Sequence, residues 1–178
     1  LDRGRFTAVG RTLEVGDPPA WETAAPLLWL FNLHYFAWLD ALQPEERRRL
    51  VLDWIERYPP SERRPGWMNY PLSLRLRNWP SMLWNAESWP DRERARVLAS
   101  IEAQAECLAD TLEHHLRGNH LLEGAITLKL LSACFRGPAV AGWRRRAEAG
   151  LGVGPAEPGF RRGRHHGRVP GERPVRPP

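Results

Sequence analysis

The sequence predicts an all-α fold in which antiparallel helical hairpins form part of an (α/α) toroid, with a disordered C-terminal tail. Apolar residues recur at helical spacing from residue 26 onward. Helices that are apolar on one face alternate with helices that are apolar nearly all round, as expected for the outer and inner layers of such a fold. The connections are short, which makes neighbouring helices antiparallel. A plain helical bundle is the alternative.

Residues 1–25 are predicted to be an irregular or short-stranded lead-in, because glycines and prolines interrupt them repeatedly. The first helix is expected over residues 26–41 and is apolar on almost every side. Its longest apolar run, residues 24–39, is interrupted by Asn32 and His34 and is shorter than the ~20 residues of a membrane span. We therefore expect a buried helix and no membrane span.

Four more helices follow from the pattern. Pro44 fits the first turn of a helix that ends before Pro59. The next helix begins near Pro71, and Pro80 is expected to kink or break it because proline has no amide donor. Residues 88–91 resemble a capping box at the start of a long amphipathic helix. Gly118 ends that helix, and residues 119–135 form a helix that is apolar on most sides.

The chain changes character near its end. A sixth helix begins after Pro138, and residues 26–146 make up the predicted partial toroid domain. Residues 147–178 hold seven Gly, six Pro and six Arg without hydrophobic periodicity. Such a composition is typical of a disordered tail. A shift of the reading frame near Ala147 is the other interpretation of this segment.

Composition limits the functional classes. The chain has 178 residues, 42% of them hydrophobic, which is enough for one domain with a core. Its net charge of +5 comes with 25 Arg and one Lys but no nucleic-acid recognition motif, so we expect no nucleic-acid partner. Two Cys and no metal-ligand spacing predict no disulfide framework, no metal and no cofactor. The chain starts at Leu1 without a signal peptide, so we expect an incomplete N-terminus, and periplasm or bacterial cytoplasm both fit; the oligomeric state stays open.

The most informative polar pair is Asn119 and His120, at the predicted start of a nearly all-apolar helix. An Asn amide donates two hydrogen bonds and can hold a carboxyl group. An adjacent His can orient a substrate or exchange a proton near neutral pH. We therefore take both as candidate catalytic residues. The alternative is simple N-capping by Asn119 with His120 packed against its neighbours.

Two further clusters are candidates for substrate binding. His34 and Tyr35 lie in an otherwise apolar helix and could face a central cavity, although packed core residues are the plainer interpretation. In the other cluster, Trp67 and Tyr70 could stack on a sugar. Helical spacing places Arg75 and Asn78 on one face, where Arg suits recognition of a carboxylate or sulfate. A buried Arg that ties loop carbonyls together is the alternative.

Three segments in order carry a resemblance to a known family: LWLFNLHYFAWL (28–39), GWMNYPLSLRLRNW (66–79) and LEHHLRGNHLLEGAITL (112–128). Over residues 5–146 the chain resembles the N-terminal region of the heparinase II/III-like polysaccharide lyases. The resemblance implies an (α/α) toroid that acts on an acidic, uronate-containing polysaccharide by β-elimination. It also implies that Asn119 neutralises the uronate carboxylate, with His120 at the same site.

The chain departs from that family after the Asn-His pair. The family's catalytic Tyr and a further His lie downstream, followed by a mainly β domain, whereas the last Tyr of this chain is Tyr70. We therefore expect a lyase fragment that is inactive alone. A non-catalytic, glycan-binding helical module is the alternative.

Overall fold

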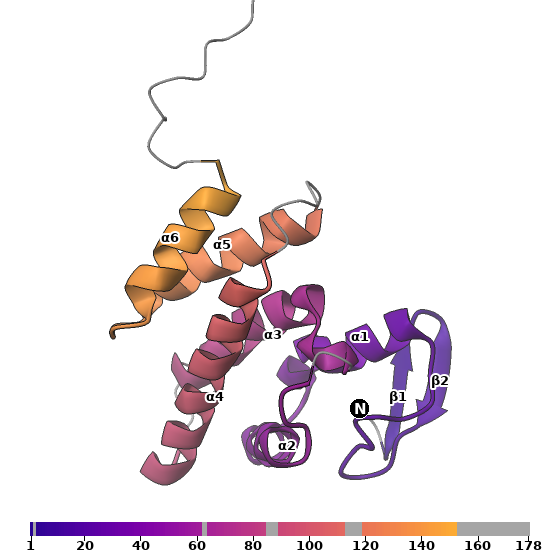
Figure 1. The fold of residues 1–178 in the computed structure, drawn as a ribbon. Coiled ribbons are helices and arrows are strands. Elements are labelled where there is room, and N and C mark those ends of the chain that lie inside the picture. Colours follow the sequence, from indigo (N-terminus) through magenta and orange to yellow (C-terminus); the bar gives the residue numbers. More distant parts are fainter. Residues whose placement is uncertain (2, 62–63, 85–88, 113–118, 153–178) are drawn as a thin grey trace, which may run out of the picture.

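The computed structural model describes residues 1, 3–61, 64–84, 89–112 and 119–152, and these are mostly helical (Figure 1). The predicted all-α class is confirmed. The lead-in forms a small antiparallel hairpin of β1 (Arg5–Ala8) and β2 (Arg11–Glu14), in which Phe6 pairs with Leu13. The predicted disordered tail lies outside the described residues from 153 onward.

In the described part of the chain, six α-helices and two 3-10 turns follow the hairpin. They are α1 (Leu27–Tyr35), η1 (Ala37–Ala41), α2 (Pro44–Arg57), η2 (Pro65–Trp67), α3 (Asn69–Trp84), α4 (Asp91–Asp110), α5 (Asn119–Cys134) and α6 (Val140–Gly150). Helix α3 lies at the centre and contacts α1, α4 and α5, while α5 and α6 pack side by side (Figure 1). Helix α6 runs past the boundary that the sequence suggested at residue 146.

The first predicted helix is shorter than expected. Helix α1 ends at Tyr35 because Phe36 adopts a left-handed backbone conformation, with φ of 58°, and η1 follows. No glycine marks this break in the sequence. The Phe36 side chain is buried and lies against the rings of Trp21, Trp54 and Trp79, so tertiary packing holds a conformation that a bulky residue rarely adopts.

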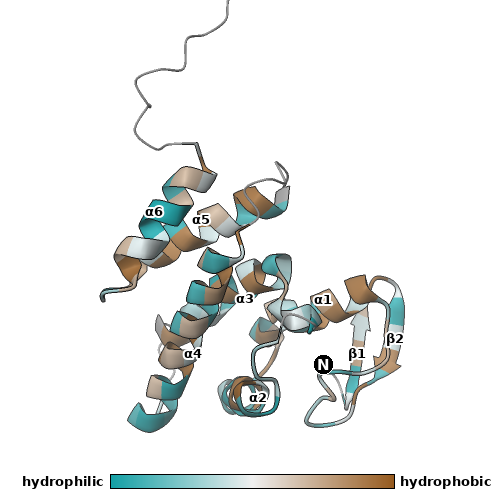
Figure 2. Ribbon diagram, viewed as in Figure 1, coloured by the Kyte–Doolittle hydropathy of each residue, from teal (hydrophilic) through white to brown (hydrophobic). Residues whose placement is uncertain are grey.

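Helices α2 and α4 have the amphipathic pattern of outer helices. Hydrophilic residues cover much of α4 in Figure 2, whereas Val97, Ile101 and Leu108 face the core. Helix α2 begins at Pro44, as predicted, and buries Leu50 and Trp54. Pro90 precedes α4 without a side-chain cap. Ser88, on which the predicted capping box depends, lies outside the described residues.

Pro80 does not break α3, which continues to Trp84. Its missing amide costs the helix one hydrogen bond, to the carbonyl four residues earlier. Leu76, Trp79 and Met82 are buried on either side of it, and this packing holds the helix together. Tertiary burial therefore outweighs the local effect of the proline.

The helices enclose one aromatic core. Trp54 and Trp79 are both fully buried, with ring centroids 5.3 Å apart and planes at 90°, and Trp67 stacks on Trp54 at 5.7 Å. Within the described part of the chain, no helix is both long enough and apolar enough to cross a lipid bilayer. Some apolar side chains stay exposed, notably Leu122 and Leu130 on α5.

Candidate functional site

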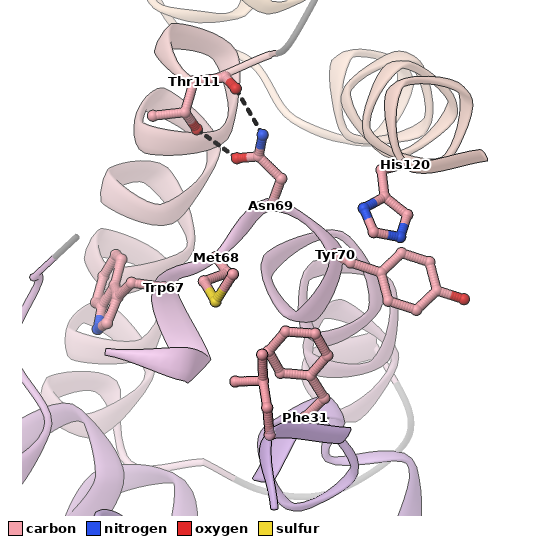
Figure 3. Close-up of a pocket in the computed structure, with 8 residues that line it drawn as sticks. Phe31, Trp67, Met68, Asn69, Tyr70, Thr111 and His120 are labelled. Atoms are coloured by element: carbon pink, nitrogen blue, oxygen red, sulfur yellow. Dashed lines mark hydrogen bonds between the residues drawn. The ribbon is translucent and has the colours of Figure 1, made fainter. Parts of the chain in front are cut away.

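An open cavity of about 460 Å³ lies where α1, the η2 segment, the end of α4 and the start of α5 meet (Figure 3). Its lining is mainly aromatic and apolar, with an amide, a hydroxyl and an imidazole. The lining residues are Leu27, Phe31, Trp67, Met68, Asn69, Tyr70, Thr111 and His120. A cavity with apolar walls and a few placed polar groups is the usual form of a small-ligand site.

Tyr70 and His120 form the central feature of this cavity. Their rings stack with centroids 4.8 Å apart and an angle of 21° between planes. Tyr70 comes from the first turn of α3 and His120 from the first turn of α5, so the stack joins two helices across the cavity wall (Figure 3). The His120 side chain is exposed, and its imidazole can therefore donate or accept a hydrogen bond with a ligand.

Tyr35 extends this aromatic row from α1. Its ring meets Tyr70 edge to face, with centroids 5.8 Å apart. Burial, and to a lesser extent the neighbouring Tyr70, raises the pKa of Tyr35 to about 12. The phenol therefore stays protonated under ordinary conditions and serves as a support for Tyr70.

A pair of polar side chains closes the side of the cavity next to α4. Asn69 donates from Nδ2 to the Thr111 carbonyl at 2.6 Å, and the Thr111 hydroxyl donates to Asn69 Oδ1 at 2.6 Å. Both dashed lines are visible in Figure 3. This reciprocal pair fixes the orientation of the amide and links the start of α3 to the end of α4. Neither residue is among the candidates predicted from the sequence, and only the position of Asn69 beside Tyr70 could have indicated one of them.

The structure brings together three of the predicted site residues, namely Trp67, Tyr70 and His120. Asn119 is the first residue of α5 and therefore lies next to His120, but its side chain is outside the described residues. Trp67 is 7% exposed, and its indole donates to the Tyr58 carbonyl at 3.2 Å. It therefore contributes an aromatic wall rather than a hydrogen bond.

His34 is not among the residues that line the cavity, and its side chain is completely buried. Its Nδ1 accepts a hydrogen bond from the indole of Trp54 at 3.1 Å, and its ring stacks on Tyr58 at 4.6 Å. Burial and, secondarily, the charge of Arg75 lower the pKa of His34 to about 3, against an opposing backbone contact with Trp21. His34 is therefore a neutral core residue, which is the plainer of the two interpretations from the sequence.

Arg75 and Asn78 share one face of α3, as the spacing predicted, but they contact the end of α1. Asn78 donates from Nδ2 to the Tyr35 carbonyl at 2.8 Å, and Arg75 donates from Nη1 to the His34 carbonyl at 3.2 Å. The last carbonyls of a helix have no partner within it and carry partial negative charge. The two side chains satisfy them, and Trp38 does the same for Leu33 at 3.0 Å.

Arg75 is fully buried and has no carboxylate partner among the hydrogen bonds described. It donates to the Gln104 side chain at 2.7 Å and to the Gly66 carbonyl at 2.8 Å, and its guanidinium lies 4.2 Å from the centre of the Trp54 ring. Burial lowers the pKa of Arg75 to about 9, so the group stays charged at neutral pH. It cannot reach a ligand in the cavity, and it acts as the buried Arg that ties carbonyls together.

Helices α3 and α5 are held together beneath the Tyr70–His120 stack. Arg77 forms an ion pair with Glu123 at 2.6 Å, and the Thr127 hydroxyl donates to the Ser73 carbonyl at 3.3 Å. Gly124 of α5 also comes close to the segment after α4, since an added Cβ would lie 2.8 Å from a methyl group of Leu112 and 3.6 Å from Ser73 Oγ of α3. These contacts give the cavity a rigid floor.

The arrangement suits a ring-shaped polar ligand. Aromatic faces stack on the apolar face of a sugar, and the imidazole and amide supply hydrogen bonds at the edge. Within the described residues, no group of three or more His, Cys, Asp or Glu side chains lies together in a way that could hold a metal ion. No protein-family model, curated protein or solved structure matches the chain.

Proposed function

We propose that this chain carries the glycan-binding, helical part of a polysaccharide lyase that acts on uronate-containing acidic glycans by β-elimination. The observation that supports it most is the Tyr70–His120 stack at the cavity, with Asn119 adjacent to His120 in the chain. A ligand on this stack would meet an aromatic surface and an imidazole at the start of a helix. The positive end of the α5 dipole lies there as well, which favours an anion such as a uronate carboxylate.

In this proposal the residues at the starts of α3 and α5 have different roles in the reaction. The amide of Asn119 would neutralise the uronate carboxylate and thereby favour removal of the neighbouring C5 proton. As that proton leaves, the C4–C5 double bond forms, the C4–O bond breaks and the leaving oxygen takes up a proton. Tyr70 and His120 are the residues of the described cavity lining whose side chains can exchange a proton.

A non-catalytic glycan-binding module is the second candidate. It is favoured by the environment of Tyr35, which holds its proton up to a pKa of about 12. A phenol that holds its proton so strongly is a poor base for a C5 proton. In this case the cavity would bind the same acidic glycan and release it unchanged.

His120→Ala is expected to weaken binding of a uronate oligosaccharide about 10- to 100-fold, because a charge-assisted hydrogen bond contributes about 1.5–3 kcal/mol. Tyr70→Ala is expected to weaken it roughly 3- to 10-fold through the lost stacking surface. Isothermal titration calorimetry with alginate and heparan-type oligosaccharides measures both effects. The same chain should bind neutral dextran oligosaccharides far more weakly.

Arg145→Ala is the matched control, since Arg145 is exposed on α6 and does not line the cavity. It removes a positive charge, so unchanged affinity shows that binding depends on the cavity rather than on net charge. If Arg145→Ala weakens binding as much as His120→Ala does, the proposed site is wrong. Ultraviolet absorbance of the new double bond during incubation then separates the lyase from the binding module.

A further inference from the structure

Gly66 is held on three sides by buried side chains. Its amide donates to the Tyr58 hydroxyl at 3.2 Å, and its carbonyl accepts from Arg75 Nη1 at 2.8 Å. The third side has no room for a side chain, because an added Cβ would lie 2.8 Å from both the His34 ring and the Tyr58 ring. We call Tyr58, Arg75 and His34 the Gly66 clamp.

The four residues that follow Gly66 all line the cavity. Residues 67–70 form one wall, and the far end of that wall is fixed by the reciprocal hydrogen bonds between Asn69 and Thr111. Met68 lies between the two fixed points, is 41% exposed and points into the cavity (Figure 3). The position of the wall is therefore set by Gly66 at one end and Asn69 at the other.

The clamp itself is fixed by the core. Arg75 is bound to α4 through Gln104 at 2.7 Å, and to the end of α1 through the His34 carbonyl at 3.2 Å. His34 is bound to α2 through the Trp54 indole at 3.1 Å. Movement of Gly66 would therefore disturb contacts with α1, α2 and α4. These contacts with the core hold Gly66, the residue before the cavity wall, in place.

We propose that Tyr58, Arg75 and His34 are positioning residues for ligand binding, because they hold Gly66 and so place the wall formed by residues 67–70. None of the three is a cavity-lining residue. The nature of the ligand rests on the proposed function, whereas the placement of the wall does not. A site held in the bound geometry by supporting residues binds more tightly than one that must be ordered by its ligand.

The two methionines of the chain provide a direct test. Met68 reports on the wall, and Met82, which is 2% exposed within α3, reports on the core. In a chain labelled with ¹³C-methyl methionine, Tyr58→Phe removes the hydroxyl that holds the Gly66 amide and keeps the ring. We expect the Met68 methyl resonance to shift and that of Met82 to stay in place. Ser132→Ala, which removes a buried hydroxyl that bonds to the Lys129 carbonyl within α5, is the control and should move neither resonance.

Gly66→Ala tests the third side of the clamp and should shift Met68 further. If that variant fails to fold, both methyl resonances will move to the shifts of an unfolded chain, and the test then rests on Tyr58→Phe. The proposal is overturned if Met68 is unmoved in Tyr58→Phe, or if Met68 and Met82 change together there, because the cluster would then support only the core.

Titration with a uronate oligosaccharide adds the functional readout. The wild-type Met68 resonance should respond to the ligand, and Tyr58→Phe should raise the dissociation constant about 2- to 10-fold through the loss of one supporting hydrogen bond. Unchanged affinity in Tyr58→Phe, with the Met68 shift present, would overturn the role of the clamp in binding. If the Met68 methyl resonance of the wild-type protein does not change when the glycan is added, the proposed function fails. The comparison of the variants without ligand still tests the clamp.

Discussion

Trp54→Ala is expected to lower the free energy of unfolding by roughly 3–5 kcal/mol, the usual cost of truncating a buried large aromatic residue. Trp54 is fully buried, stacks on Trp67 and meets Trp79 edge to face. Its loss would also leave His34 Nδ1 without its donor and Arg75 without the ring beneath it. Urea denaturation followed by far-ultraviolet circular dichroism measures the change without relying on tryptophan emission.

Trp54→Phe is the companion variant, because it keeps an aromatic ring but removes the indole donor to His34. We expect a smaller loss, roughly 1–3 kcal/mol, from one unsatisfied buried group and the reduced ring size. A loss below about 1 kcal/mol in Trp54→Ala would contradict an aromatic core centred on this residue.

The stability of the protein is expected to fall as the pH drops below about 6.5, because His34 is buried in its neutral form. Burial lowers its pKa from 6.5 to about 3 in the folded chain. Between these pH values His34 binds a proton in the unfolded chain but not in the folded chain. The free energy of unfolding therefore falls by up to about 1.4 kcal/mol for each unit that the pH is lowered. Urea midpoints at pH 7, 6 and 5 measure this slope.

His34→Gln is the matched variant for this measurement. Its side-chain amide can still accept a hydrogen bond from the Trp54 indole but does not titrate. The carboxylates of the chain contribute equally to both proteins, so the difference between the two slopes belongs to His34. Equal slopes between pH 7 and 5 would contradict the buried neutral state of His34.

Much of the fold could be predicted from local patterns. The start of α2 at Pro44 and the extent of α5 from residue 119 agree with the sequence, because helix signals at these positions are not opposed by packing. The predictions of helix boundaries are wrong where tertiary contacts outweigh the local helix signals. Phe36 ends α1 in a left-handed conformation held by aromatic neighbours from other parts of the chain, and Pro80 stays within a helix that is buried on both sides of it.

The site could be predicted only in part, for a related reason. Spacing correctly placed Arg75 and Asn78 on one face of α3, but it could not show that this face meets the carbonyls at the end of α1, about 40 residues away in the sequence. Thr111 joins Asn69 across 42 residues, and nothing in its local sequence indicates that contact. The sequence places Tyr70 and His120 in two separate candidate clusters, and their stacking is a property of the fold.

The most direct test of the central claim compares one uronate oligosaccharide with its carboxyl-reduced, neutral form, using wild-type protein and His120→Ala. The proposed site predicts that wild type binds the uronate form clearly more tightly, and that His120→Ala loses most of this preference while keeping the weaker affinity for the neutral form. Equal affinity of wild type for the two oligosaccharides, or no binding of either, would contradict the proposal that this cavity recognises an acidic glycan.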